Sequence, residues 1–353
     1  MYANEAFEES LELLERLISI PRISREEKAA AELMAADMES HGYRPERYGN
    51  NLLCTSRYYD AARPCILLLS HIDTVRPVDS WTRDPFSPAV EDGKLYGIGS
   101  NDAGASLVSL LYTFYLLDSC PNSLNLLYLA SCEEEVSGRG GMRMMSGLLP
   151  KISFAIVGEP TGMQPAIAEK GLMVLDFEVR GKSGHAAREE GINAIYRAID
   201  IVSATKGIVF DKVSPLLGKV KFTFTMMKSG TQHNVIPDVC TMTADVRSNE
   251  LYTNNEILDA VKRNLPEWCT VTPRSTDLNS SGISTDHPAI KRALELGLEP
   301  FGSPTLSDQA LLTCQSFKMG PGESGRSHSA DEFVLLDELK AAIPLYTSLL
   351  QPL

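Results

Sequence analysis

The chain has 353 residues, of which 43% are apolar and 22% charged, a composition typical of a globular protein with large buried cores. This length is too great for one ordinary compact core, so two domains are expected. The formal net charge of -13 disfavours nucleic acid and anionic membrane surfaces as partners, because both require clustered Lys and Arg, and suits a small substrate better.

The first predicted element is an amphipathic helix over residues 4–20, in which Phe7, Leu11, Leu14 and Ile18 repeat at helical spacing. Acidic residues stand where a secretory signal carries basic ones. No apolar run approaches the roughly 20 residues that span a bilayer. We therefore expect neither a signal peptide nor a membrane partner.

The cysteines indicate a reducing compartment. They are seven, an odd number without a CxxC pair, and several lie in apolar surroundings: Cys54, Cys65, Cys120, Cys132, Cys240, Cys269 and Cys314. This pattern predicts reduced, mostly buried thiols and a cytoplasmic location.

Helical patterns and β-rich runs then alternate along the chain. The predicted elements are a helix at 25–41, a strand at 64–73, a polar loop at 76–100, a helix at 106–118, and strands at 124–131 and 152–159. Continuous apolar strands separated by helices are typical of a largely parallel sheet with both faces covered.

The pattern changes after about residue 168. The predicted elements are a strand at 172–181, a helix at 191–207, strands at 220–230 and 239–248, and a helix at 255–265. A β-α-β-β-α-β order of this kind fits a small ferredoxin-like α+β unit. From about residue 279 the α/β pattern returns, with helices at 286–297 and 336–350. We therefore expect a smaller domain, 168–278, inserted into a discontinuous larger one, 1–167 plus 279–353.

Histidines and acids gather where the predicted strands of the larger domain end. They are His71 and Asp73 in SHIDT, Asp102 in GIGSNDAGAS, Glu134 and Glu135 in CEEEVSG, Glu159 in IVGEPTG, and His328 in GESGRSHSADEF. Ligands of open α/β sheets bind outside the carboxyl ends of the strands, and three of these groups directly follow a predicted strand. The convergence predicts a functional site.

Each motif alone also has a structural explanation. His71 could be satisfied within a turn, and Asp102 could form an Asx turn or cap the next helix. Glu159 could be a loop acid and His328 a surface histidine. The three acids at 133–135 would in isolation be a solvated face. The glycines of GIGSNDAG match the GxGxxG dinucleotide fingerprint poorly, so no nucleotide cofactor is expected.

Taken together, the residues match the needs of two zinc ions. Zinc takes imidazole nitrogen and carboxylate oxygen, and a catalytic site leaves positions open for water and substrate. Two ions roughly 3.5–4 Å apart need a bridging carboxylate and further ligands on each side. One central Asp, two His and two Glu supply that set, and Asp73 would orient the His71 imidazole from behind. Co²⁺ and Mn²⁺ tolerate similar ligands.

Seven short motifs extend over nearly the whole chain: HIDTV, GIGSNDAGAS, CEEEVSGRGG, GEPTG, GKSGHAA, NVIPD with ADVR, and MGPGESGRSHSADEFV. In this order they resemble the M20 family of metallopeptidases, the group that includes acetylornithine deacetylase, succinyl-diaminopimelate desuccinylase, aminoacylases and carboxypeptidase G-type enzymes. The resemblance implies a larger zinc-peptidase-like α/β catalytic domain and an inserted, smaller α+β lid and dimerisation domain.

The resemblance also implies roles for the residues of the larger domain. The metal ligands would be Asp102, which bridges both ions, His71 and Glu159 on one side, and Glu135 and His328 on the other. Glu134 would be the general base that takes a proton from water and passes it to the departing amine, and Asp73 would assist catalysis beside His71.

In the smaller domain the resemblance points to three residues. His185 would reach into the partner subunit's active site, which implies a homodimer with composite sites. Asn234 and Arg247 would contact substrate, and Arg247 suits a bidentate clamp on a carboxylate. From spacing alone, His185 is a turn histidine, and the lesser alternative for Arg247 is a pair with a neighbouring acid on its strand.

The motifs HIDTVRPVDSWTRDPF and GEPTGMQPAIAEKG resemble acetylornithine deacetylase more than the desuccinylase. One departure concerns the residues after Asp102. Many relatives carry Asp-Met-Lys-Gly at this point, whereas in this chain Asp102 is followed by Ala103, Gly104 and Ala105. The leading expectation is a dizinc deacylase of arginine biosynthesis that acts on N-acetyl or N-succinyl derivatives of ornithine or citrulline. The alternatives are a desuccinylase, a di- or tripeptidase of the same family, and a non-catalytic binding protein.

Overall fold

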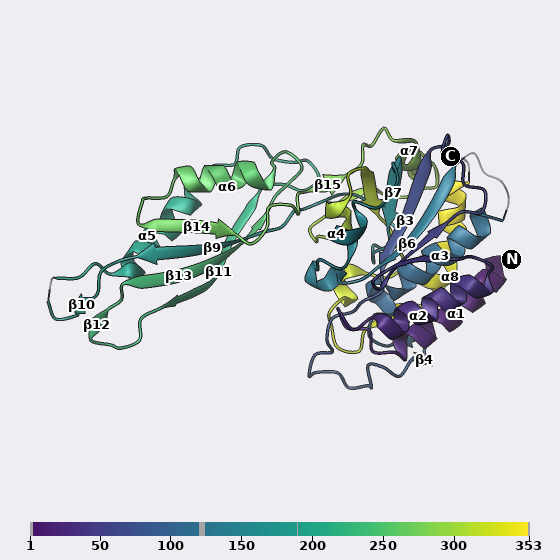
Figure 1. Cartoon of the computed structure of the whole chain (residues 1–353), viewed down its shortest axis with the longest axis horizontal. Helices are drawn as coiled ribbons and strands as arrows, with labels where there is room; N and C mark the ends of the chain where they lie inside the picture. The colour runs from purple at the N-terminus through teal and green to yellow at the C-terminus, as the bar shows by residue number, and fades with distance from the viewer. Residues whose placement is uncertain (1–2, 120–123, 189, 352–353) are drawn as a thin grey trace. The chain divides into compact units, whose positions relative to one another are not determined.

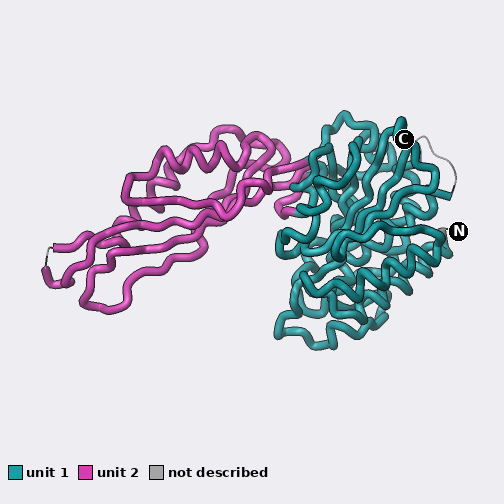
Figure 2. The backbone as a smooth tube through the Cα atoms, viewed as in Figure 1, with its two compact units in different colours: residues 1–167, 282–301, 307–353 teal, residues 168–281, 302–306 magenta. Residues whose placement is uncertain are grey.

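The computed structural model describes residues 3–119, 124–188 and 190–351. The chain forms two compact units (Figure 2). Unit 1 comprises residues 1–167, 282–301 and 307–353, and unit 2 comprises residues 168–281 and 302–306. Each unit has a hydrophobic core of its own.

Unit 1 is built around a mixed sheet (Figure 1). Its strands in spatial order are β1 (Glu46–Tyr48), β2 (Asn51–Thr55), β6 (Asn125–Ser131), β3 (Cys65–His71), β7 (Phe154–Val157), β17 (Gln315–Lys318), β8 (Ala166–Glu169) and β15 (Ser281–Gly282), and β16 (Phe301–Ser303) pairs with β8. The central strands β6, β3, β7 and β17 are parallel, whereas β2 pairs with β6 and β17 pairs with β8 in antiparallel fashion. The expected α/β class is confirmed, and the parallel arrangement holds for the centre of the sheet but not for its flanks.

Both faces of this sheet are buried, which explains the continuous apolar run of β3. Ile66 and Leu68 belong to one hydrophobic cluster, and Leu67 and Leu69 belong to another. Alternate side chains of one strand therefore enter two different cores. Each fully buried leucine contributes roughly 1.5–3 kcal/mol relative to an exposed one.

Helices cover the two faces. The first cluster includes residues from α1 (Ala3–Ile18), α2 (Lys28–Ser40), α3 (Ala105–Leu117), α7 (Pro288–Glu295) and α8 (Leu336–Leu350). The short α4 (Met142–Met145) contributes to the second. Helix α3 contacts α1, α8 and β3 and is buried on nearly every side, so its sequence is apolar all round rather than amphipathic.

The segment 76–100, which the sequence predicts to be a loop, contains a hairpin. Strands β4 (Ala89–Glu91) and β5 (Lys94–Tyr96) pair around Asp92 and Gly93, whose φ angles are 49° and 73°. Two consecutive residues with positive φ form the turn that suits a tight hairpin. Strand β18 (Phe333–Leu335) pairs with β5 and completes a three-stranded sheet.

Unit 2 has the predicted β-α-β-β-α-β order. Its elements are β9 (Met173–Arg180), α5 (Ala194–Lys206), β11 (Lys221–Ser229), β13 (Val239–Arg247), α6 (Asn254–Arg263) and β14 (Cys269–Pro273). The four strands form an antiparallel sheet in the order β11-β13-β9-β14, and both helices contribute to its core. A separate two-stranded sheet joins β10 (Gly184–His185) to β12 (Val235–Ile236).

Among the described residues, the cysteines are free thiols, and all are buried except Cys314, which is half-buried. Cys120 lies outside the described residues. Burial raises the pKa of Cys54 to about 12 and that of Cys65 to about 11, which keeps both thiols protonated and unreactive. No helix in the described part of the chain is both long and apolar enough to cross a membrane.

Candidate metal centre and active site

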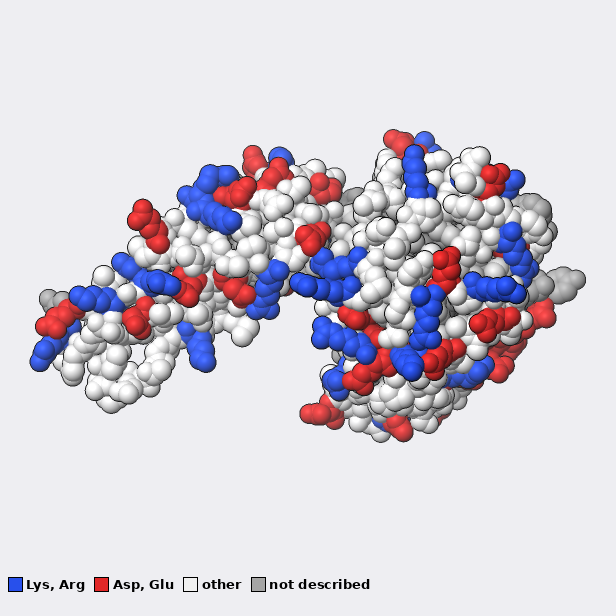
Figure 3. Space-filling view, in the orientation of Figure 1, with Lys and Arg blue, Asp and Glu red and all other residues white. Residues whose placement is uncertain are grey.

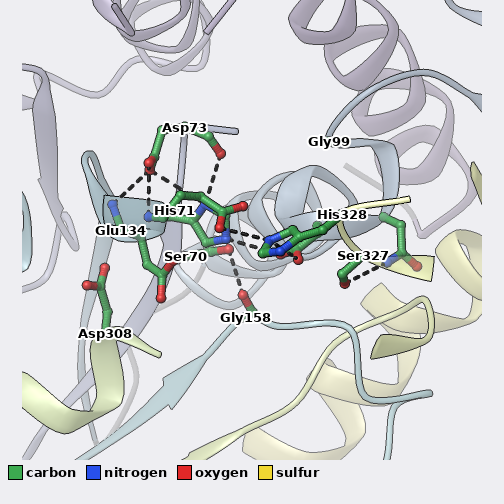
Figure 4. Close-up of polar contacts among 12 residues, drawn as sticks. Ser70, His71, Asp73, Gly99, Glu134, Gly158, Asp308, Ser327 and His328 are labelled. Atoms are coloured by element: carbon green, nitrogen blue, oxygen red, sulfur yellow. Dashed lines mark hydrogen bonds and ion pairs between the residues drawn. The ribbon is translucent and has the colours of Figure 1, made fainter. Parts of the chain in front are cut away.

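The carboxyl ends of three neighbouring parallel strands deliver the polar groups. Strand β3 ends at His71, with Asp73 two residues further on. Strand β6 ends at Ser131 and leads into the acids at 133–135, and β7 ends at Val157 and leads to Glu159. Parallel neighbours end at the same edge of a sheet, and Figure 4 shows His71, Asp73 and Glu134 close together at this edge.

Asp102 lies at the centre of this group. It is part of a short irregular helical segment, Ser100–Gly104, directly before α3. One carboxylate oxygen is 3.3 Å from Nε2 of His71, and the other is 3.6 Å from Nε2 of His328. The same nitrogen of His328 is 2.9 Å from a carboxylate oxygen of Glu135.

The structure therefore brings four of the five predicted ligands together. His71, Asp102 and Glu135 each offer a ligand atom within 4.8 Å of the others. His328 joins them through the two contacts above, from a loop residue with φ 57°. Glu159 interacts with Asp102 and His71 through charge.

Asp73 connects the histidine motif to the acidic motif. Its fully buried carboxylate accepts hydrogen bonds from the backbone N–H groups of Glu134, at 3.1 Å, and Glu135, at 3.2 Å, and from the hydroxyl of Ser24, at 2.7 Å. Nδ1 of His71 is 3.0 Å from the backbone carbonyl of Asp73 and 3.6 Å from its carboxylate. Asp73 thus fixes the backbone of the acidic pair as well as the imidazole.

Glu133, the first of the three acids, has a structural role. It has a φ angle of 56°, and its carboxylate turns back to accept a hydrogen bond from the N–H of Gly140 at 3.2 Å. A Cβ atom on Gly138 would come within 2.5 Å of the Cβ atom of Glu133, so a larger residue there would force this loop to shift. Three consecutive acids are compatible with the fold because the first faces its own loop, Glu135 pairs with His328, and the charge of His71 acts on Glu134.

Two glutamates of the site, Glu134 and Glu159, lie in an environment that favours their protonated forms. For Asp73 and Asp102 burial also acts to raise the pKa, but hydrogen bonds and charge interactions with His71 outweigh it and lower the pKa of both. Burial raises the pKa of Glu159 to about 8, with the charge of Asp102 adding to the effect. Burial raises the pKa of Glu134 well above its usual range, and nearby Glu159 and Asp308 add to it, although His71 opposes. Such a cluster is stabilised by any positive charge placed among its members.

The pKa values of the two histidines are raised as well, but for a different reason. Burial lowers the pKa of His71, but hydrogen bonds with Asp102 and Asp73 outweigh burial and raise it well above its usual value. The hydrogen bond to Glu135 raises the pKa of His328 to about 9. In the protein alone these protons supply the positive charge that the acids require.

The predicted catalytic residue His185 and the predicted substrate-contacting residues Asn234 and Arg247 lie in unit 2. His185 is exposed in β10, and its Nδ1 accepts a hydrogen bond from the N–H of Ala187 at 3.1 Å, as expected of a turn histidine. Asn234 directly precedes β12, and its carbonyl accepts a hydrogen bond from Ala186 at 3.0 Å, so it adjoins His185. Arg247 forms two hydrogen bonds with Asp245, at 2.9 and 3.1 Å, which is the strand ion pair kept open as its alternative role.

A sequence profile of peptidase family M20/M25/M40 matches residues 67–351. The chain belongs to this family. The resemblance inferred from the motifs is thereby confirmed, and with it a hydrolase that acts on amide bonds in a metal-dependent family.

The chain is similar in sequence to proteins that bear the two names considered in the sequence analysis. Acetylornithine deacetylase of Proteus mirabilis is 28% identical over 357 residues, which cover 92% of this chain and 91% of that protein. Succinyl-diaminopimelate desuccinylase of Wolbachia pipientis is 27% identical over 279 residues, covering 74% of this chain and 69% of that protein.

Solved structures share the fold. Aminopeptidase PepT of Bacillus cereus has a TM-score of 0.80 and 17% identity, with 98% of each chain covered. The YXEP protein of Bacillus subtilis, a dinuclear metal binding peptidase of the M20 family, has a TM-score of 0.74 and 17% identity, again with 98% of each chain covered.

The residues of this M20 member fit divalent cations. Two imidazoles and several carboxylates converge at the sheet edge, and burial, with repulsion from neighbouring carboxylates adding to it, raises the pKa of Glu134 and Glu159 there. Imidazole and carboxylate are the ligands that zinc and related cations accept. Cations at this position would replace the protons that now reside on the acids and histidines.

Several buried polar residues around the site were not singled out from the sequence. Arg22, Asn101, Lys318 and Glu332 are all buried. Lys318 is the last residue of β17, and its charge counteracts the rise in the pKa of Glu159. In sequence these residues look like ordinary surface residues, and only the fold reveals that they lie behind the site.

Proposed function

We propose that this M20 chain is a zinc-dependent amidohydrolase that removes the N-acyl group from an Nα-acyl amino acid, with N-acetyl- or N-succinyl-ornithine or -citrulline as substrate. The supporting observation is the position of Glu134 beside the cluster of His71, Asp102, Glu135 and His328. The similarity to acetylornithine deacetylases over 92% of the chain supports the substrate class and a role in arginine biosynthesis.

We propose that the five predicted ligands hold two divalent cations, with Asp102 shared between them. When bound, such ions polarise an amide carbonyl and lower the pKa of water. Glu134 then accepts the proton of the attacking water and delivers it to the departing amine nitrogen. Burial raises its pKa above the ordinary value, which makes the carboxylate a stronger base than an exposed glutamate.

Asp73 supports this chemistry by holding the backbone of Glu134 and Glu135. Its carboxylate accepts a hydrogen bond from the backbone N–H of each residue of the acidic pair, which fixes the position of the base and of the adjacent ligand relative to His71. We propose that Arg247 and Asn234 contact the substrate. In that role Arg247 would give up its two hydrogen bonds to Asp245 and form two hydrogen bonds to the substrate carboxylate instead.

A homodimer in which His185 serves the partner's site forms part of the proposal. Strand β11 is an edge of the unit 2 sheet, and it exposes Met226 (65%) and Met227 (50%). The adjacent helix α5 exposes Tyr196 and Ile199. An open strand edge beside apolar side chains supports pairing with a second copy.

The charge distribution supports a small substrate, and the free, mostly buried cysteines of the described part of the chain support a cytoplasmic enzyme. The net charge is -13, and on the face drawn in Figure 3 acidic and basic side chains are interspersed within each unit. Neither feature favours nucleic acid or an anionic membrane as partner.

The decisive experiment is a substrate panel with the purified chain and added Zn²⁺. The panel holds N-acetylornithine, N-acetylcitrulline, N-succinylornithine, N-succinyl-diaminopimelate, and representative di- and tripeptides. We expect release of the amino acid from an N-acyl substrate, abolished by a chelator and by Glu134→Gln purified in parallel. Preferential cleavage of peptides with a free α-amino group would instead identify a peptidase, and turnover of no amide would refute the proposal.

A further inference from the structure

Arg22 has one of the largest fully buried side chains among the described residues, with 1% exposure. One guanidinium nitrogen donates a hydrogen bond to the carbonyl of Ile72, and another donates to the carbonyl of Gly99 at 2.9 Å. Ile72 lies between His71 and Asp73, and Gly99 begins the turn that leads to Asp102. Arg22 therefore ties together the two backbone segments that carry a histidine ligand and the central aspartate.

Glu332 holds the same turn through its N–H groups. Its carboxylate, 3% exposed, accepts hydrogen bonds from the backbone N–H of Gly99 at 2.9 Å, Asn101 at 2.9 Å and Asp102 at 2.8 Å. Glu332 follows His328 by four residues, so it also joins the turn to the loop of the second histidine. Gly99 is thus held at its carbonyl by Arg22 and at its N–H by Glu332.

Asn101 adds a further link between the turn and the histidine loop. Its side-chain oxygen accepts a hydrogen bond from the N–H of Glu323 at 2.9 Å, and its amide nitrogen donates to the carbonyl of Glu323 at 3.1 Å. Gly99 has a φ angle of 70°, and a Cβ atom there would lie 2.4 Å from the Arg22 guanidinium. The turn is therefore built to accept the arginine closely.

We propose that Arg22 and Glu332 are positioning residues that hold the Gly99–Asp102 turn from opposite sides and thereby set the affinity of the site for divalent cations. This inference rests on the proposed metal centre and names the residues that shape it. Neither residue contacts substrate. They act through the backbone of Asp102 and of the segment that carries His71.

Charge and position predict opposite effects for Arg22. A buried cation close to Asp73 and Asp102 repels a divalent cation, so removing its charge alone would tighten metal binding. Loss of the two carbonyl contacts would instead release the Asp102 turn and weaken metal binding, as loss of outer partners of ligands does elsewhere by about 10–100-fold. The sign of the change therefore separates the two roles.

The test measures Zn²⁺ affinity of the full chain by competition with a chromophoric chelator, for wild type, Arg22→Met, Arg22→Lys and Glu332→Gln. Arg16→Met, at an exposed position of α1, is the matched control. We expect affinity to fall about 10–100-fold in all three site variants. Lysine retains the charge but not the planar fork that reaches two carbonyls, so Arg22→Lys should not restore binding, and the control should match wild type.

Thermal unfolding of the metal-free proteins and their far-UV circular dichroism show whether a variant is folded. Affinities within about twofold of wild type in folded variants, or tighter binding by Arg22→Met, would overturn the inference. If Arg22→Met fails to fold, Arg22→Lys and Glu332→Gln decide by the same criterion. Failure of the wild type itself to bind Zn²⁺ would instead refute the proposed metal centre.

A double-mutant cycle with Arg22→Lys and Glu332→Gln tests the shared mechanism. Because both residues act on Gly99, the second substitution should cost less affinity when the first is already present. Fully additive losses would show that the two residues do not act through one turn and would overturn that part of the inference.

Discussion

Raising the pH should destabilise the metal-free protein, and Glu159 allows the size of the effect to be worked out. In the fold, burial raises the pKa of Glu159 from an ordinary 4.5 to about 8, with Asp102 adding to the shift and His71 opposing it. An acid with a higher pKa in the folded state binds its proton more tightly there than in the unfolded chain. Its stabilising contribution is therefore complete below the unfolded pKa and is lost as the pH rises through about 8.

The magnitude follows from that difference. One pKa unit corresponds to about 1.4 kcal/mol, so the whole difference for Glu159 amounts to roughly 5 kcal/mol. Between about pH 5.5 and about pH 8.5 the free energy of unfolding should fall by about 3 kcal/mol from this group. His71 and His328 act in the same direction, because a histidine with a raised pKa loses its contribution as the pH rises through the folded value.

The measurement is urea unfolding in the presence of a chelator across this pH range. Glu159→Gln should reduce the decline by about 3 kcal/mol and leave the part that His71, His328 and Glu134 contribute, whereas Glu12→Gln, at an exposed position of α1, should leave the decline unchanged. Saturating Zn²⁺ should stabilise the protein more at high pH, because metal and protons compete for the same ligands. A free energy of unfolding that stays constant over this range, or an unaltered decline in Glu159→Gln, would refute the reasoning.

Three further predictions concern the site and the core. Glu134→Gln should lower kcat by about 10²–10⁴-fold while the Zn²⁺ stoichiometry is retained. Steady-state kinetics and a metal titration test this, and activity that persists in the variant would show that Glu134 is not the base. Asp73→Asn offers an amide donor where the N–H of Glu134 or Glu135 needs an acceptor. The free energy of unfolding should therefore fall by about 1–3 kcal/mol, and the affinity for Zn²⁺ should fall by about 10–100-fold. Unchanged values in urea unfolding and in chelator competition would contradict this prediction. Leu129→Ala, in the middle of β6, should cost about 2–5 kcal/mol in urea unfolding without altering Zn²⁺ affinity, and a loss below about 1 kcal/mol would show that the core readjusts at this position.

The sequence predicts best where one strong pattern acts alone. The apolar runs of β3, β6 and β7 mark buried strands, and their ends locate His71, Glu135 and Glu159 before any coordinates are known. The predicted residues meet because parallel strands end at one edge of a sheet. The α+β order of unit 2 follows in the same way from the alternation of strand and helix patterns.

Residues whose environment is created by distant segments were not predicted. Strand β17 has the short and mostly polar sequence Gln-Ser-Phe-Lys, and it becomes a central strand only because β7 and β8 flank it. Arg22 and Glu332 have charged side chains that usually lie at the surface. Their partners are backbone groups 77 and about 230 residues away, and no local pattern encodes such contacts.

The same strand bears on the order in which the protein can be assembled during synthesis. Residues 315–318 fill the middle of the large sheet, and the loop of His328 follows them, so both leave the ribosome after all other strands of that sheet. The β-α-β-β-α-β block of unit 2 is already complete at Pro273. In a nascent chain the small unit is therefore nearly complete, whereas in the large unit strands β7 and β8 still lack β17, the strand that pairs with both. During that interval these strands offer unsatisfied backbone groups to any other chain nearby, which makes early release or C-terminal truncation a route to aggregation.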